Sequence, residues 1–139
     1  MSEFKNILFT VSDDGYIATI SLNRPKKFNA ISFELLAEVE KCVLEKINMY
    51  GNKIRVVVLM AEGKHFTAGI DLKSAMSMDS VVQDESKKEG CEDEDEDEEE
   101  DPSRKAIRIN DHLLNLQRYT SSLEKCRVPV ICAVSGYCI

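Results

Sequence analysis

The chain has 139 residues, of which 43% are hydrophobic and 31% are charged, with a formal net charge of −7. This length fits a single domain, and no apolar stretch is long enough to cross a bilayer, so we expect no membrane span. The acidity is local: without the ten-residue acidic run Glu92–Asp101 the formal charge becomes +3. We expect no nucleic-acid partner, and the mildly basic remainder is compatible with a phosphate-bearing ligand.

The cysteines indicate an intracellular protein with reduced thiols. Their number is five, which is odd, and no pair has Cys-x-x-Cys spacing. His65 and His112 are the only histidines, and neither neighbours a cysteine at ligand spacing. We therefore expect no zinc site or other metal site.

The first elements form a predicted β-hairpin. Ile7–Ser12 and Ile17–Leu22 flank the turn signal Asp13-Asp14-Gly15, and the second segment alternates between apolar and polar residues. Asn23-Arg24-Pro25 ends the second strand, and a loop follows over Lys26–Ile31.

A helix and a buried strand come next. Ser32 is a good N-cap, and apolar residues at helical spacing predict one helix over Phe33–Tyr50. Ile54–Met60 is a near-continuous apolar run, typical of a strand buried on both faces. The loop Gly63–Gly69 follows it directly.

The second half contains the acidic segment between two helices. Asp71 is a predicted cap for a short helix reaching about Met78. Residues 80–103 lack apolar periodicity, and we expect a disordered acidic insertion there. A long helix over Ile107–Lys125 and a buried strand over Val130–Val134 complete the pattern.

This order of strands and helices predicts an α/β fold. The stretches Ile54–Ile70 and Val130–Ile139 look alike, since each is an apolar strand that runs into a glycine-bearing turn. The likeness suggests a repeated ββα unit stacked as a spiral.

The loop after the buried strand is the best candidate for chemistry. Ala68-Gly69 places small side chains and backbone N–H groups just before the helix cap at Asp71. Backbone donors gathered at such a junction suit an oxygen that becomes negative during a reaction. The plain alternative is a tight loop with no chemical role.

Three stretches in this order resemble the crotonase, or enoyl-CoA hydratase/isomerase, superfamily: Ile20–Ile31, Gly63–Leu72 and Val128–Ile139. Phe66–Leu72 looks most like the dienoyl-CoA isomerase branch. The resemblance implies an incomplete crotonase-like spiral of ββα units, with residues 1–139 as the N-terminal part of one domain. Members of this family act on fatty acyl thioesters, and coenzyme A is part of the substrate, so no separate cofactor is expected.

The resemblance also assigns residues. The Ala68 backbone N–H would be the first of two oxyanion donors, and Gly69, Ile70, Asp71 and Leu72 would line the acyl and pantetheine path. Lys26 or Lys27 would lie near the nucleotide end, where a cation can meet phosphate. From the residues alone, Asp71 is first a helix cap, and the two lysines are equally well a solvated surface pair. The resemblance assigns no role to His65, and we expect Tyr137 to serve in packing rather than in chemistry.

This sequence contains no residues that match several of the groups that the family uses for catalysis. The second oxyanion donor and the acid–base carboxylates lie in family segments that follow the one matching Ser135–Ile139. We therefore expect part of an isomerase that shifts double bonds of unsaturated acyl-CoA in β-oxidation, inactive as this chain alone. The alternatives are an enoyl-CoA hydratase, or a truncated non-catalytic paralogue that binds acyl-CoA or a partner. The resemblance implies a mitochondrial or peroxisome-like location and, for a complete chain, a homotrimer or hexamer.

Overall fold

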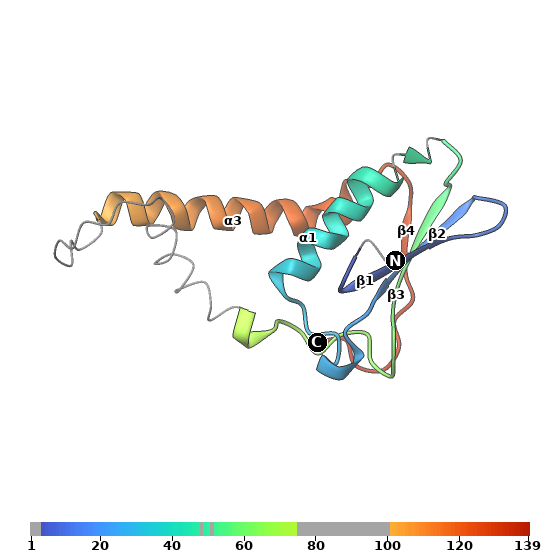
Figure 1. The fold of residues 1–139 in the computed structure, drawn as a ribbon, viewed down its shortest axis with the longest axis horizontal. Coiled ribbons are helices and arrows are strands. Elements are labelled where there is room, and N and C mark those ends of the chain that lie inside the picture. Colours follow the sequence, from blue (N-terminus) through green and yellow to red (C-terminus); the bar gives the residue numbers. More distant parts are fainter. Residues whose placement is uncertain (1–3, 48, 51, 75–100) are drawn as a thin grey trace, which may run out of the picture.

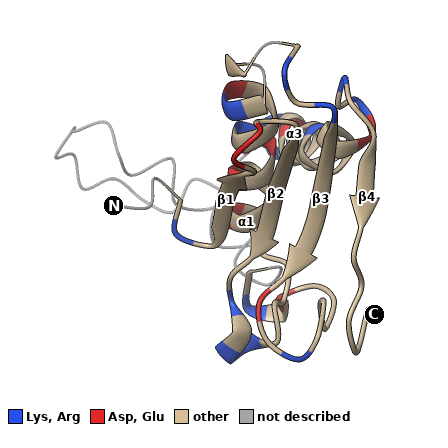
Figure 2. Cartoon of the chain, turned by 90° about the vertical axis from the view of Figure 1, so that its right-hand side faces the viewer, with Lys and Arg blue, Asp and Glu red and all other residues tan. Residues whose placement is uncertain are grey.

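The computed structural model describes residues 4–47, 49–50, 52–74 and 101–139. They form a four-stranded sheet in the order β1-β2-β3-β4 with helices packed behind it, as Figures 1 and 2 show. The predicted α/β class is confirmed. The strands are β1 (Ile7–Val11), β2 (Ile17–Leu22), β3 (Val56–Ala61) and β4 (Val130–Cys132).

The direction of the strands determines where the loops meet. β1 and β2 form the predicted antiparallel hairpin, with Val11 opposite Ala18. β2 pairs parallel with β3, and β3 pairs parallel with β4. The carboxyl ends of three strands therefore lie at the same edge of the sheet, and each is followed by a loop there.

The core lies between the sheet and α1 (Phe33–Lys41). The Ser32 side chain accepts a hydrogen bond from the Leu35 backbone N–H at 3.3 Å, so the predicted N-cap is confirmed. The largest fully buried apolar side chains come from both layers and from the segments between them: Ile7, Ile20, Leu35, Cys42, Ile47, Ile54 and Val57.

The predicted single helix over Phe33–Tyr50 is wrong in its second half. α1 ends at Lys41, and a π-helical segment, η2 (Cys42–Ile47), continues it. Leu35, Val39, Val43 and Ile47 are buried and recur every four residues, which exceeds the 3.6 residues of an α-helical turn. A wider π turn compensates for this drift and returns Ile47 to the core.

The second long helix begins earlier than predicted. α3 (Pro102–Glu124) starts at Pro102 rather than Ile107, because the Asp101 carboxylate accepts from the Ser103 N–H at 3.1 Å and proline suits the first helical position. The predicted insertion over 80–103 is therefore wrong at its end, and its residues 80–100 lie outside the described residues.

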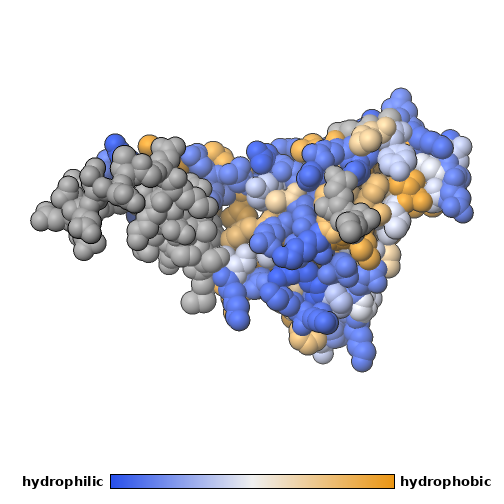
Figure 3. Space-filling model, in the orientation of Figure 1, coloured by the Kyte–Doolittle hydropathy of each residue, from blue (hydrophilic) through white to orange (hydrophobic). Residues whose placement is uncertain are grey.

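The apolar face predicted for α3 is buried only near its carboxyl end. Leu123 packs against the core, whereas Ile109 and Leu113 are 40% and 49% exposed. Figure 1 shows α3 extending beyond the sheet, and Figure 3 shows hydrophobic side chains at the surface near it. Within the described residues, no helix is both long and apolar enough to cross a membrane.

Two predicted elements remain, the last strand and the short helix after Asp71. β4 ends at Cys132 rather than Val134, and the chain pairs again through an isolated bridge between Thr67 and Cys138. Residues 72–74 are helical after Asp71, as predicted, and the remainder of that helix to Met78 lies outside the described residues.

Candidate functional site

Three loops converge at the carboxyl edge of the parallel strands. Residues 23–31 follow β2, residues 62–70 follow β3, and residues 133–139 follow β4. Figure 1 places the C-terminus and the turn η1 (Pro25–Lys27) at this end of the sheet. Ligand sites of open α/β sheets occur at this edge, because the loops there can vary while the strands stay fixed.

Asn29 joins the first two loops. Its backbone lies in the left-handed region with φ 52°, and the residue is only 1% exposed. The side-chain Oδ1 accepts from the Arg24 N–H at 2.8 Å, and Nδ2 donates to the carbonyls of Glu62 and His65 at 2.8 and 2.9 Å. The Asn29 carbonyl accepts from Thr67 Oγ1 at 2.9 Å. Sequence reasoning missed this role, because three of the partners lie more than thirty residues away.

Most backbone N–H groups of the loop after β3 are held within the protein. Their acceptors belong to the loop itself and to the two segments that converge with it, 23–31 and 133–139. The bonds are Phe66 N–H to the Ser135 carbonyl at 2.7 Å, Thr67 to Tyr137 at 3.1 Å, Ala68 to Phe28 at 3.0 Å, Gly69 to Thr67 Oγ1 at 3.1 Å, and Asp71 to Ile31 at 2.9 Å.

Ile70 is the exception in this series. Its N–H reaches no acceptor among the described residues, and its side chain is exposed. The preceding Gly69 has φ 86°, a left-handed turn that breaks the pairing at this point. The N–H predicted as the donor, that of Ala68, is instead occupied by the Phe28 carbonyl. Between Phe66 and Asp71, the geometry therefore offers Ile70 rather than Ala68 as the available backbone donor.

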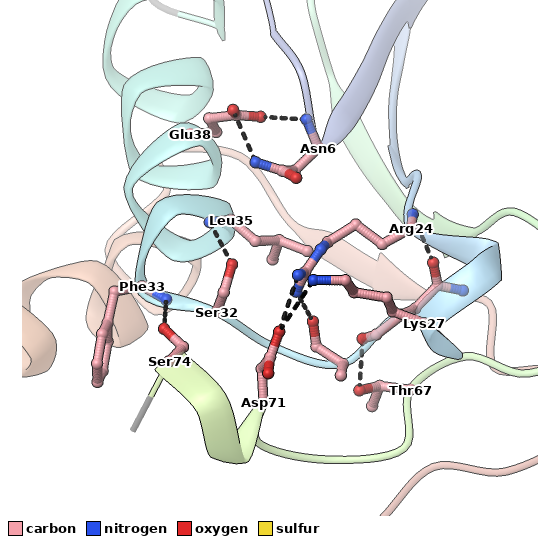
Figure 4. Close-up of polar contacts among 12 residues, drawn as sticks. Asn6, Arg24, Lys27, Ser32, Phe33, Leu35, Glu38, Thr67, Asp71 and Ser74 are labelled. Atoms are coloured by element: carbon pink, nitrogen blue, oxygen red, sulfur yellow. Dashed lines mark hydrogen bonds and ion pairs between the residues drawn. The ribbon is translucent and has the colours of Figure 1, made fainter. Parts of the chain in front are cut away.

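Asp71 is held by cations. Arg24 Nη2 lies 2.8 Å from Asp71 Oδ2, and the two side chains are only 11% and 13% exposed, as Figure 4 shows for the contact. Arg24 also donates to the Ala30 carbonyl, and Lys27 Nζ lies 3.9 Å from Asp71. The hydrogen bond from Arg24 holds the pKa of Asp71 below its usual value, with smaller effects of Lys27 and the Ser74 backbone. Asp71 is therefore a persistent anion and a weak proton acceptor.

The structure brings most of the predicted site residues together. Lys27 reaches Asp71 from η1, and Gly69, Ile70 and Leu72 are consecutive with it, the last two with exposed side chains. Lys26 lies on the same 3-10 turn as Lys27 and is exposed. Cationic and apolar surface thus meet beside the free Ile70 N–H.

A hollow lies beside this loop, and none of the predicted site residues lines it. It has a volume of about 240 Å³ and is lined by Pro25, Phe28, Asn29, Glu62, Gly63, Lys64 and His65. Within the described residues, no three His, Cys, Asp or Glu side chains are close enough to hold a metal ion.

Known proteins are similar to this chain in both sequence and fold. The Enoyl-CoA hydratase/isomerase family profile matches residues 13–96. The peroxisomal Delta(3,5)-Delta(2,4)-dienoyl-CoA isomerase of Arabidopsis thaliana is 27% identical over 140 residues, covering 100% of this chain and 45% of that protein. The mitochondrial Delta(3,5)-Delta(2,4)-dienoyl-CoA isomerase of Homo sapiens is 33% identical over 132 residues, covering 95% of this chain and 35% of that protein.

A solved structure matches in the same way. The crystal structure of an enoyl-CoA hydratase from Bacillus anthracis superposes with a TM-score of 0.63 at 25% identity, covering 95% of this chain and 40% of that one. The chain thus spans less than half the length of these relatives.

Proposed function

The chain belongs to the enoyl-CoA hydratase/isomerase family and has part of the crotonase fold, and we propose that it is the acyl-CoA-binding part of a dienoyl-CoA isomerase-like enzyme. The two relatives named above, which match over 95% or more of this chain, are dienoyl-CoA isomerases by name, and this supports an isomerase. One observation carries the assignment of the site: between Phe66 and Asp71, the N–H of Ile70 is the one that reaches no acceptor among the described residues.

The proposed chemistry is stabilisation of a thioester enolate. The thioester oxygen accepts a hydrogen bond from the Ile70 N–H, and the bond strengthens as the oxygen becomes negative. One preorganised donor of this kind lowers a barrier by about 3–4 kcal/mol. Ala68 then contributes its small side chain and its bond to Phe28, which fixes the loop, rather than the donor itself.

The remaining site residues have proposed roles in binding. Lys26 and Lys27 would meet the phosphates of coenzyme A, and Ile70 and Leu72 offer exposed apolar surface to the acyl chain or pantetheine. Asp71 shapes the loop through Arg24 instead of moving protons, because its lowered pKa makes it a poor base.

Proton transfer needs groups that we do not assign to this chain. We therefore propose that it binds the thioester without converting it. The same site also suits an enoyl-CoA hydratase, the alternative that the Bacillus anthracis structure favours. The relatives named peroxisomal and mitochondrial support a proposed location in one of these organelles.

The donor is tested by removing one N–H at a time. Replacing Ile70 by its α-hydroxy acid analogue turns the amide into an ester with the same side chain. We expect affinity for an unreactive thioether analogue of a 3,5-dienoyl-CoA, measured by calorimetry, to fall about 10-fold, since one hydrogen bond to a ligand is worth about 1.4 kcal/mol. The free energy of unfolding should fall only slightly, because the ester carbonyl of Gly69 still accepts the hydrogen bond from the Ile31 N–H, although more weakly than the amide carbonyl does.

The matched control is the same replacement at Ala68. It should lower stability by about 1 kcal/mol by removing the bond to Phe28, with a smaller effect on affinity. Loss of binding at Ala68 together with none at Ile70 would return the donor role to Ala68. Turnover of a 3,5-dienoyl-CoA or hydration of a trans-2-enoyl-CoA by the purified chain would contradict the proposed inactivity, and the faster reaction would decide between isomerase and hydratase.

A further inference from the structure

His65 makes two contacts with the segment 135–139. The Tyr137 backbone N–H donates to His65 Nδ1 at 3.2 Å, and the two rings stack with centroids 4.3 Å apart and planes at 19°. An Nδ1 atom that accepts a hydrogen bond carries no proton, so the ring is neutral with its proton on Nε2. The contact therefore depends on the protonation state of the imidazole.

These contacts lie at the centre of the pairing between two loops. The Phe66 and Thr67 N–H groups donate to the carbonyls of Ser135 and Tyr137, and the Ile139 N–H donates to the Thr67 carbonyl at 3.3 Å. His65 itself is fixed from the other side, since Asn29 Nδ2 donates to its carbonyl. The ring thus lies between the loop 62–70 and the segment 135–139 that pairs with it.

Gly136 shows how close the approach is. Its φ is 61°, and a Cβ atom there would lie 2.3 Å from the Lys64 carbonyl oxygen and 2.5 Å from His65 Nδ1. Backbone cannot yield to such contacts without moving the segment. Only glycine allows Tyr137 to reach the imidazole in this way.

The paired segment also contacts the loop that carries the free donor. Thr67 Oγ1 accepts from the Gly69 N–H at 3.1 Å, directly before Ile70. On its open side, a Cβ atom at Gly69 would lie 3.4 Å from the Ile139 carbonyl oxygen. A shift of the segment 135–139 would therefore displace Gly69, the residue that orients the Ile70 N–H.

We propose that His65 is a positioning residue whose neutral Nδ1 locks the segment 135–139 against the donor loop and so sets the Ile70 N–H for the acyl thioester. The ligand part of this statement rests on the proposed function, whereas the locking contact does not. Protonation of Nδ1 would place an N–H opposite the Tyr137 N–H, and the two donors would repel. The lock requires an Nδ1 atom without a proton, so acid that protonates the imidazole removes it.

Few other charges surround the ring. The hollow beside the ring is also lined by two charged residues of its own loop, Glu62 and Lys64. Pro25 and Phe28 of the facing turn bring no charge, and Lys26 and Lys27 lie between them in the sequence. Across the pairing, the phenol of Tyr137 stacks on the ring, and Cys138 follows it. Variants at position 65 keep all of these neighbours, so a difference between them and the wild type reports on the imidazole itself.

Two variants separate the acceptor from the ring stack. His65→Asn keeps an acceptor, Oδ1, near the position of Nδ1 but has no charge change, and His65→Phe keeps the stack but has no acceptor. Amide hydrogen exchange at Tyr137 and Thr67, corrected for intrinsic rates, would be followed from pH 8 to 5, with affinity for the thioether analogue measured alongside.

The wild-type chain should lose protection at Tyr137 about 10-fold as the pH falls, the equivalent of one hydrogen bond. His65→Asn should stay protected and His65→Phe unprotected, both without pH dependence, and affinity should follow the same pattern. Equal protection in wild type and His65→Phe, or a wild-type pH profile in His65→Asn, would overturn the lock.

The two proposals fail in distinguishable ways. If no variant binds the analogue at any pH, the proposed function fails, while the exchange data still judge the lock. If His65→Phe does not fold, the comparison of wild type with His65→Asn decides, because only the wild type has an imidazole whose protonation can break the contact.

Discussion

The carboxyl edge of the sheet and the amino-terminal half of α3 are built in opposite ways. At the edge, the buried Asn29 and the half-buried Arg24 find hydrogen-bond partners in other loops. Along α3, apolar side chains such as Ile107 and Leu114 lie on the surface, and the backbone is held by its own helical bonds. The edge is therefore defined by long-range contacts, whereas the amino-terminal half of α3 depends on local helix formation.

Asn29→Ala tests the edge most severely. It removes three side-chain hydrogen bonds at a fully buried site and places a Cβ-bearing residue without a polar group at φ 52°. We expect the free energy of unfolding to fall by about 3 kcal/mol in urea denaturation. Asn29→Gly is the matched control: it loses the same bonds but relieves the backbone, so it should be about 1 kcal/mol less harmful than alanine.

The two helix caps give a direct comparison of the regions. Ser32→Ala removes the cap of α1, which packs on the core, and should lower the free energy of unfolding by about 1 kcal/mol. Asp101→Ala removes the cap of α3 and should chiefly increase amide exchange in the first turn of that helix. Equal global losses would show that the two ends of the molecule unfold as one unit.

Acid should weaken the edge through Asp71. Because its pKa is lowered in the folded state, its ionised form stabilises the fold above about pH 4, and this contribution is lost as the pH falls further. The urea midpoint of the wild type should therefore drop more than that of Asp71→Asn between pH 5 and pH 3. Parallel curves for the two proteins would mean that the contact with Arg24 adds nothing to stability.

Ile107→Ser should have the smallest effect. The side chain is 62% exposed in the amino-terminal half of α3, and surface changes of this kind usually alter stability by less than about 0.5 kcal/mol. A loss of more than 1 kcal/mol, measured by urea denaturation, would indicate that this face is covered in solution and would remove the contrast with the edge.

The sequence predicted elements whose signals are local. The hairpin turn at Asp13-Asp14-Gly15, the cap at Ser32 and the presence of a strand at β3 follow from neighbouring residues. The prediction that this strand is buried on both faces was wrong, because buried and half-buried residues alternate along Val56–Ala61. The signals for the start of α3 were also local, namely an aspartate followed by proline, but they were hidden within the acidic run. The π segment was missed because a four-residue stripe fits an α-helix over two turns and drifts only over three.

The loop was recognised from sequence, but its details were not. Which N–H remains free depends on Phe28 and on Thr67 Oγ1, and neither acceptor follows from the local pattern around Ala68 and Ile70. The role of Asn29 depends on a left-handed backbone and on carbonyls in another loop. Residue types thus indicated the kind of site, whereas tertiary contacts determined which atoms are available.

The bridge between Thr67 and Cys138 also has a consequence for the order of folding. The hairpin joins residues as close as Val11 and Ala18, but the bond from Tyr137 to His65 spans 72 residues. Closing such a long segment loses more chain entropy than closing a hairpin, so its contacts are expected to form after the local ones. The pairing of the donor loop with the segment 135–139 should therefore form later in folding than the hairpin of β1 and β2.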